Sequence, residues 1–276
     1  MIRSARKLTI VERFIGRLEP AASDPPGRST RALPTSCCPT FKRNGAVDPK
    51  AAMEFDRYAA DYQCEVNRAA GVSVERLAAE KARLLLAVLA AELGDPKQLR
   101  VLDVGCGIGL VDQELARGVG ELCGADVSLK SLEFARLRAA SAHFVRYDGA
   151  KLPFGDASFD AVFASCVLHH VPPHSRADFI AEMLRPLRRN GLVIIIEHNP
   201  ANPVTRFIVS RCAFDADAVL LTCRETVDLL ATGGAAGAQW RYIGFLPFRH
   251  PLVERAERTI AWLPAGAQYC VWGRKS

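Results

Sequence analysis

The sequence lacks the features that mark several protein classes. Its nine cysteines are an odd number, lie scattered along the chain and form no CxxC pair, so neither a disulfide framework nor a metal site such as a zinc site is indicated. No transmembrane helix is expected, because the longest apolar stretch, 82–91, contains Arg83 and is far shorter than the roughly 20 residues that span a bilayer. The first residues contain no apolar core of a signal peptide. We therefore expect a cytoplasmic protein.

Positive charge is concentrated in the first fifty residues. The formal net charge is +6, and residues 1–50 hold ten Lys and Arg side chains against four acidic ones, while the remainder carries equal numbers of each. The rest of the chain has no global field that would attract a polyanion, so a nucleic-acid substrate is not expected. The prolines at 20, 25, 26, 34 and 39, among Ser, Thr, Gly and Arg, predict that 1–50 is a disordered basic extension. A transit peptide or membrane-surface helix over 1–18 is the alternative, which Glu12 and Glu19 oppose.

Apolar patterning becomes regular after this extension and predicts one domain over 51–276. Helical spacing is found first at 52–69 and 74–93. Strand-like runs then alternate with helical runs, which predicts βαβ crossovers and a doubly wound, mainly parallel α/β sheet. The expected strands are 100–104, 121–127, 143–147, 159–165, 192–197, 240–246 and 268–273, the last suited to an antiparallel position. The expected later helices are 110–118, 129–140, 177–187 and 224–231.

A glycine-rich turn follows the first expected strand, in the run VLDVGCGIG at 101–109. Glycines there let the backbone turn tightly and approach a ligand, which implies a nucleotide-like ligand. The dinucleotide fingerprint GxGxxG is absent because its third glycine comes one residue early, at Gly109, and this argues against a dehydrogenase. Asp103 would repel a pyrophosphate and therefore favours a cationic group nearby, although a loop-bracing Asp is the alternative.

Two further carboxylates follow the next strands. Asp126 ends the second strand, 21 positions after Gly105, where a carboxylate can accept hydrogen bonds from both ribose hydroxyls. Asp148 precedes Gly149 at the end of the third strand and is placed to accept a hydrogen bond from an exocyclic amine such as that of adenine. An ordinary turn of Asp followed by Gly is the alternative for this pair.

Four ordered motifs resemble those of class I S-adenosylmethionine-dependent methyltransferases. They are VLDVGCGIG at 101–109, GADVS at 124–128, YDGAKLPFGDASFDAVFASCVLHHV at 147–171 and RPLRRNGLVIIIEHNP at 185–200. The resemblance implies a Rossmann-like fold and S-adenosylmethionine as the cofactor. By this resemblance, the methionine end of the cofactor is bound by Asp103, Gly105, Cys106 and Gly107. The ribose and adenine are bound by Asp126 and Val127, and the adenine is also bound by Asp148 and Gly149. The region near the methyl group is lined by Ser165 and Cys166. Within this resemblance Cys106 is a small packing residue rather than a nucleophile.

The last part of the chain carries a less general resemblance. The segments 197–221 and 262–275 are similar to a bacterial subgroup associated with polysaccharide and other secondary-metabolite gene clusters. This resemblance favours a small-molecule or glycan substrate.

Candidate catalytic residues follow the fourth strand. An oxygen acceptor must lose a proton, and His169 or His170 is the best-placed base beside the expected methyl group. A loop-packing histidine is the alternative for either residue. Glu197, His198 and Asn199, after the fifth strand, are secondary candidates for contacts with the acceptor.

Aromatic residues at helical spacing precede the sheet. Phe55, Tyr58 and Tyr62 most simply form a core face. In the family that this sequence resembles, the helix before the sheet often covers the cofactor with an aromatic near the sulfonium, where cation–π attraction is reasonable. Tyr58 and Tyr62 are therefore candidates for a lid.

Two missing motifs narrow the acceptor. The Asn/Asp-Pro-Pro-Tyr motif of amine-directed family members is replaced by Ser165, Cys166, Val167 and Leu168, and no Pro-Cys pair of the cytosine C5 type is present. A hydroxyl oxygen on a small molecule or glycan is the preferred acceptor, with a carbon of a quinone- or polyketide-like substrate second. An RNA methyltransferase that uses the basic arm, and a non-catalytic cofactor-binding module, stay open as alternatives. A monomer or a homodimer is expected.

Overall fold

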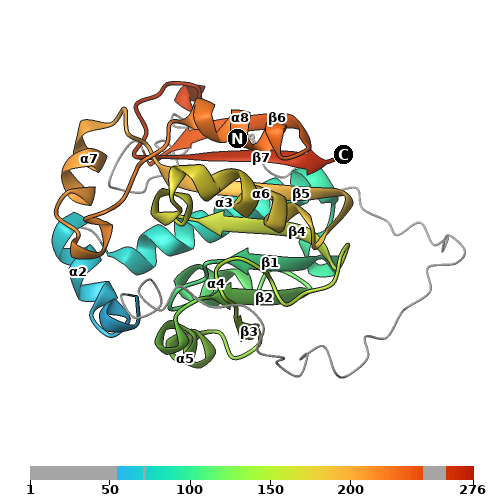
Figure 1. Ribbon diagram of the computed structural model, residues 1–276, viewed down its shortest axis with the longest axis horizontal. Helices are drawn as coiled ribbons and strands as arrows, with labels where there is room; N and C mark the ends of the chain where they lie inside the picture. Colours follow the sequence, from blue (N-terminus) through green and yellow to red (C-terminus); the bar gives the residue numbers. More distant parts are fainter. Residues whose placement is uncertain (1–54, 71–72, 245–258) are drawn as a thin grey trace, which may run out of the picture. The chain divides into compact units, whose positions relative to one another are not determined.

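The structure is a computed structural model that describes residues 55–70, 73–244 and 259–276 (Figure 1). All of these residues belong to one compact unit. The basic extension expected over 1–50 lies outside them. Among the helices described, none is long and apolar enough to cross a membrane.

One sheet of seven strands organises the described residues, in the order β3-β2-β1-β4-β5-β7-β6. The strands are β1 (Arg100–Val104), β2 (Glu121–Asp126), β3 (His143–Arg146), β4 (Phe159–Ser165), β5 (Leu187–His198), β6 (Ala235–Ile243) and β7 (Gln268–Lys275). The first five pair in parallel, whereas β7 is antiparallel to both β5 and β6. The predicted doubly wound, mainly parallel sheet with an antiparallel last strand is confirmed.

Helices cover both faces of this sheet. The helices are α2 (Tyr62–Ala70), α3 (Val74–Leu93), α4 (Leu110–Leu115), α5 (Leu129–Arg138), α6 (Arg176–Leu184), α7 (Pro203–Val209) and α8 (Cys223–Thr232). Side chains alternate along β5, so that Val193 and Ile195 join the core under α6 and α8 while Ile194 and Ile196 join the core under α3 and α4. A strand buried on both faces needs a continuous apolar run, which explains the sequence LVIII at 192–196.

The strand order reverses between β1 and β4, and this reversal positions the site. β2 and β3 lie beyond β1 on one side, and β5 lies beyond β4 on the other. The carboxyl ends of β1 and β4 therefore flank a crevice, which is where open α/β sheets bind ligands. Helices α2 and α7 contact each other and lie at the edge to which β4 points (Figure 1).

Some element boundaries differ from those expected. The helix expected over 52–69 is interrupted, because residues 55–58 are helical, 59–61 form a turn and α2 begins at Tyr62. The helix expected over 177–187 ends at Leu184, since Pro186 has no N–H to continue it, and β5 begins directly afterwards. Strand β6 begins at Ala235 rather than 240.

Candidate active site

The turn after β1 depends on glycines with left-handed backbone conformations. Gly105 has a φ of 79° and its N–H donates to the carbonyl of Ala125 at 2.7 Å, which ties the turn to β2. A Cβ on Gly105 would lie 2.5 Å from Cγ2 of Val167, so the absence of a side chain lets the loops after β1 and β4 touch. Gly107 has a φ of 53°, and a Cβ there would meet no atom within 4 Å. The turn therefore has one open position, which faces a cavity.

Asp126, at the end of β2, completes this turn. Its Oδ2 accepts the Gly107 N–H at 2.8 Å and its Oδ1 accepts the Ser128 N–H at 2.8 Å. Burial raises the pKa of Asp126 above its ordinary value. The hydrogen bonds from Ser128 and Gly107 act to lower this pKa but are outweighed by burial. Each carboxylate oxygen has a second lone pair. Asp126 therefore holds the glycine turn and can still accept hydrogen bonds from hydroxyls in the cavity that it lines.

Asp148 and Gly149 follow β3, as expected, and also line the cavity. Oδ1 of Asp148 accepts the N–H groups of Ala150 at 2.9 Å and Lys151 at 2.7 Å, while Gly149 has a φ of 80°. The Asp therefore braces its own turn. Val127, whose side chain lies against Gly149, lines the cavity as well.

Two buried carboxylates lie beneath the glycine turn. Asp103 is 2% exposed, and its Oδ1 has no hydrogen-bond partner among the described residues. Burial and then the charge of Asp112 raise the pKa of Asp103 well above its usual range. Asp112 is fully buried, and neither of its carboxylate oxygens has a hydrogen-bond partner among the described residues. Because only Asp103 also lines the cavity, it offers an unsatisfied carboxyl oxygen to a ligand group, and a cationic group there would favour its ionised form. Cys106 is buried close by, and burial raises the pKa of its thiol.

Cys166 occupies a charged position directly after β4. It has a φ of 59°, and its Sγ lies 3.0 Å from Nζ of Lys81 and 3.2 Å from Nε2 of Gln268. Burial acts to raise the pKa of the thiol, but the charges of Lys81 and His198 outweigh it and lower the pKa to about 6. Ser165 precedes it with a buried Oγ, and both line the cavity. Lys81 had no signal in the sequence, because it lies within an ordinary amphipathic helix.

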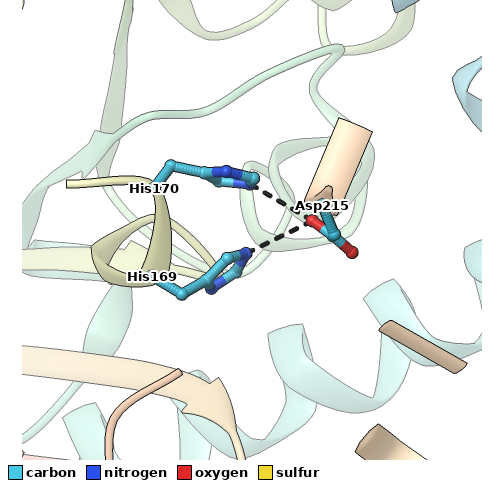
Figure 2. A group of neighbouring side chains, drawn as sticks. All are labelled: His169, His170 and Asp215. Atoms are coloured by element: carbon cyan, nitrogen blue, oxygen red, sulfur yellow. Dashed lines mark ion pairs between the residues drawn. The ribbon is translucent and has the colours of Figure 1, made fainter. Parts of the chain in front are cut away.

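Both sequence-predicted histidines lie beside Asp215, a residue that sequence analysis missed (Figure 2). Nδ1 of His169 lies 2.6 Å from Oε2 of Glu197, and its Nε2 lies 3.5 Å from Oδ1 of Asp215. Nε2 of His170 lies 3.4 Å from the same Oδ1. Burial acts to lower the pKa of His169, but the contacts with Glu197 and Asp215 outweigh it and raise this pKa to about 10. The pKa of His170 is lowered to about 4, first by burial and then by the charge of His169.

The secondary candidates at the end of β5 have different positions, with Glu197 and His198 among its last paired residues and Asn199 directly after it. Glu197 is 1% exposed and lies behind His169, and its Oε1 also accepts the N–H groups of Val167 at 2.9 Å and Leu168 at 2.6 Å. His198 lines the cavity, with its ring centroid 5.2 Å from that of His169. Asn199 is 2% exposed and donates to the carbonyls of Pro264 and Gly266, so it braces a turn.

Aromatic side chains form another part of the cavity wall. Tyr62 stacks on Phe214 with ring centroids 5.0 Å apart, and Tyr58 meets the same ring edge-on at 6.2 Å. Phe55 packs edge-on against His170 at 5.2 Å. Burial raises the pKa of Tyr62 above its ordinary value, so its hydroxyl stays protonated.

These features share one cavity of about 1840 Å³. A pocket for a single small ligand occupies roughly 300–1,000 Å³. The cavity extends from Asp126 and the glycine turn to His169, His170 and Asp215, and it continues to Trp240 and Trp262. It has room for a nucleoside-sized ligand and a second molecule beside it.

Comparison with known proteins agrees with this geometry. Residues 102–195, which include the glycine turn and both histidines, match the family model described as a methyltransferase domain. The chain carries a class I S-adenosylmethionine-dependent methyltransferase domain. The methyltransferase domain is 33% identical over 104 residues to an uncharacterised methyltransferase of Synechocystis, covering 37% of this chain and 49% of that protein. It is 33% identical over 161 residues to a demethylmenaquinone methyltransferase of Thermotoga maritima, covering 57% of this chain and 66% of that protein. The chain thus spans about half of the first curated relatives, or less.

Solved structures are similar in fold to this chain over a larger part of its length. A possible histamine N-methyltransferase of Thermotoga maritima superposes with a TM-score of 0.59 at 19% identity, covering 81% of this chain and 99% of that one. A (4+2)-cyclase superposes on the methyltransferase domain with a TM-score of 0.56 at 19% identity, covering 84% and 99%. At these identities the likeness shows the fold alone, and that fold also serves a cyclase.

Proposed function

We propose that this chain transfers the methyl group of S-adenosylmethionine to a hydroxyl oxygen of a small molecule or a glycan. The observation that supports this most is the continuity of the cavity, which joins the Asp126 and glycine-turn end to the end that holds His169 and His170. One chamber can therefore hold a donor and an acceptor together. Alignment of two reactants in one site lowers the barrier by several kcal/mol in favourable cases, at most about 7–11 kcal/mol.

The residues present fit the cofactor at three points. Asp126 is placed to accept hydrogen bonds from both ribose hydroxyls, and Asp148, Gly149 and Val127 line the wall where the adenine would lie. The open side of Gly107 admits the methionine part. The unpartnered Oδ1 of Asp103 is a suitable neighbour for a cationic group in an otherwise buried place.

The methyl-bearing end would lie near the carboxyl end of β4. When bound, the cofactor supplies a methyl group on a sulfonium that is already activated for transfer. Ser165 and Cys166 line this region, while Gly105 and Cys106 shape the turn opposite. Tyr58 and Tyr62, with Phe214, would cover the cofactor from this side, and an aromatic face there favours a neighbouring cation.

The acceptor hydroxyl would lose its proton at the cluster of His169, His170 and Asp215. His169 is held by the contact of 2.6 Å between its Nδ1 and Glu197 and by the charge of Asp215, 3.5 Å from its Nε2, so it acts chiefly by holding the cluster in place. His170 is the more exposed of the two histidines, with 21% of its side chain accessible against 1% for His169. It is uncharged at neutral pH because its pKa lies near 4. General-base assistance contributes about 10²–10⁴-fold in rate, and His170 would lie at the low end of this range because a base with so low a pKa is weak at neutral pH.

Methyl transfer to carbon is the second candidate. Several curated relatives are named demethylmenaquinone methyltransferases, including those of Staphylococcus aureus and Thermotoga maritima. Their name supports a quinone-like acceptor for this chain, as do the apolar side chains of Val204, Ile208, Trp240 and Trp262 on the cavity wall. An O-methyltransferase of Penicillium expansum, 34% identical over 109 residues, supports the oxygen acceptor to a similar degree.

A labelled donor separates these functions. The chain is incubated with S-adenosylmethionine labelled at the methyl carbon and with panels of phenols, sugars, glycans and demethylated quinones, and products are located by mass spectrometry and NMR. We expect a labelled methyl on oxygen, with Asp215→Asn lowering kcat while the affinity for S-adenosylhomocysteine stays unchanged. A labelled methyl on carbon would instead establish the second candidate. Tight cofactor binding without transfer to any acceptor would favour a non-catalytic module.

A further inference from the structure

Three potential metal ligands converge at the acceptor end of the cavity. Figure 2 shows the rings of His169 and His170 directed at the same carboxylate oxygen of Asp215. One nitrogen of each ring and one Asp215 oxygen all lie within 4.8 Å of one another. The histidines belong to a short 3₁₀ turn after β4 (Leu168–His170), whereas Asp215 belongs to another, Ala213–Asp215, after α7. Two separate segments therefore bring their ligand atoms to one point.

We propose that His169, His170 and Asp215 bind a divalent transition-metal ion, with Zn²⁺ as the best-fitting candidate. Two imidazoles and one carboxylate, with a further position open, are the ligand set of catalytic zinc sites. Harder ions such as Mg²⁺ and Ca²⁺ prefer oxygen ligands and fit less well.

The distances between the ligand atoms suit this ion. Zn²⁺ forms bonds of about 2.0–2.1 Å in a tetrahedral arrangement, which places neighbouring ligand atoms about 3.3–3.4 Å apart. Nε2 of His169 and Nε2 of His170 lie 3.5 and 3.4 Å from Oδ1 of Asp215. Both separations are too long for a good hydrogen bond but match two ligands of one metal.

The groups around the ligands are also those that a metal site requires. Glu197 accepts at Nδ1 of His169 at 2.6 Å, which keeps a proton on Nδ1, so that a metal ion would displace the proton of Nε2 and bind there. Oδ1 of Asp215 is buried and has no hydrogen-bond partner among the described residues. A buried carboxylate oxygen without a hydrogen bond is costly, and a cation between it and the two rings would satisfy it.

The open coordination position would face the chamber, because all three ligand residues line it. A metal there would bind the acceptor oxygen and lower the pKa of its hydroxyl, so that the proton passes to water before the methyl group arrives. With the ion bound, His170 would act as a ligand and would no longer take this proton. This role rests on the proposed methyl transfer. The proposal that the three residues bind a metal ion does not depend on the proposed methyl transfer.

Metal binding is tested directly on the full chain. The purified protein is assayed for bound metal by mass spectrometry, stripped with a chelator and titrated with Co²⁺, whose visible absorption reports tetrahedral coordination. We expect one ion per chain and an intense visible band, with Asp215→Asn and His170→Asn each weakening binding by at least about 100-fold. Glu197→Gln should weaken binding by about 10–100-fold. His174→Asn, which replaces an exposed histidine a few residues away, should leave binding unchanged.

Binding of S-adenosylhomocysteine is measured on the same variants by calorimetry. Retained cofactor binding shows that a variant is folded, and it separates failure of this metal site from failure of the proposed function. The proposal is overturned if the stripped chain binds S-adenosylhomocysteine but takes up no Co²⁺ or Zn²⁺. It is equally overturned if Co²⁺ binds with the same affinity and spectrum to Asp215→Asn, since the ion would then lie elsewhere.

Discussion

Alanine at Gly107 and alanine at Gly109 should have different effects, although both glycines have a positive φ. A Cβ on Gly109 would lie 2.8 Å from Cα of Ala135 in α5, a backbone atom that cannot turn aside. A Cβ on Gly107 would meet no protein atom within 4 Å. Left-handed backbone costs an alanine roughly 1–2 kcal/mol, and crowding in a packed place adds about 1–3 kcal/mol. Gly109→Ala should therefore lower the free energy of unfolding by about 2–5 kcal/mol, and Gly107→Ala by about 1–2 kcal/mol.

Cofactor binding should show the opposite order. The methyl group of Gly107→Ala would project into the space that the methionine part is proposed to occupy, so the affinity for S-adenosylhomocysteine should fall at least about tenfold, or about 1.4 kcal/mol. Urea unfolding gives the stabilities, and calorimetry at a temperature where both variants are folded gives the affinities. The reasoning is refuted if Gly107→Ala binds S-adenosylhomocysteine as tightly as the parent, or if Gly109→Ala unfolds at the parent's urea concentration.

Three further predictions concern individual side chains. The rate of alkylation of Cys166, followed on its own peptide, should rise with pH and have its midpoint near pH 6. Lys81→Met should move that midpoint to higher pH, and an unmoved midpoint would exclude Lys81 as the cause of the low thiol pKa. Burial raises the pKa of Asp112 to about 7, so between about pH 4 and pH 7 the native state retains a proton that the unfolded chain has released, and stability falls as pH rises through this window. Asp112→Asn should therefore stabilise the protein against urea more at pH 8 than at pH 5, and a gain independent of pH would contradict this. Tyr269→Phe removes a buried hydroxyl that donates to Leu221, and it should lower the free energy of unfolding by about 1–3 kcal/mol, whereas an unchanged urea midpoint would mean that water replaces the bond.

The type of sheet and the grouping of three carboxylates at one edge of it could be predicted from the sequence because their signals are local. Each strand of the parallel sheet is a short apolar run, and Asp103, Asp126 and Asp148 each stand in or directly after one. Parallel strands bring their carboxyl ends together, so residues far apart in the sequence meet once the strand order is known. The structure places all three of these residues on one cavity.

The acceptor end could not be predicted in the same way. Asp215 lies 45 positions after His170 in a short 3₁₀ turn, and no periodicity connects the two residues. Lys81 reaches Cys166 from a helix that precedes the sheet, across 85 residues. Helix α7 did have a local signal that went unread, because Asn202 caps it and Pro203 occupies its first turn.

The affinity of S-adenosylhomocysteine for the parent chain and for Asp126→Asn tests the central claim most directly. Asparagine keeps one acceptor oxygen but loses the charge and the second acceptor that two ribose hydroxyls require. We predict one site in the parent and an affinity at least about 30-fold lower in Asp126→Asn, equivalent to about 2 kcal/mol. Equal affinities for the two proteins, or no binding to the parent, would contradict the assignment of this cavity to the cofactor.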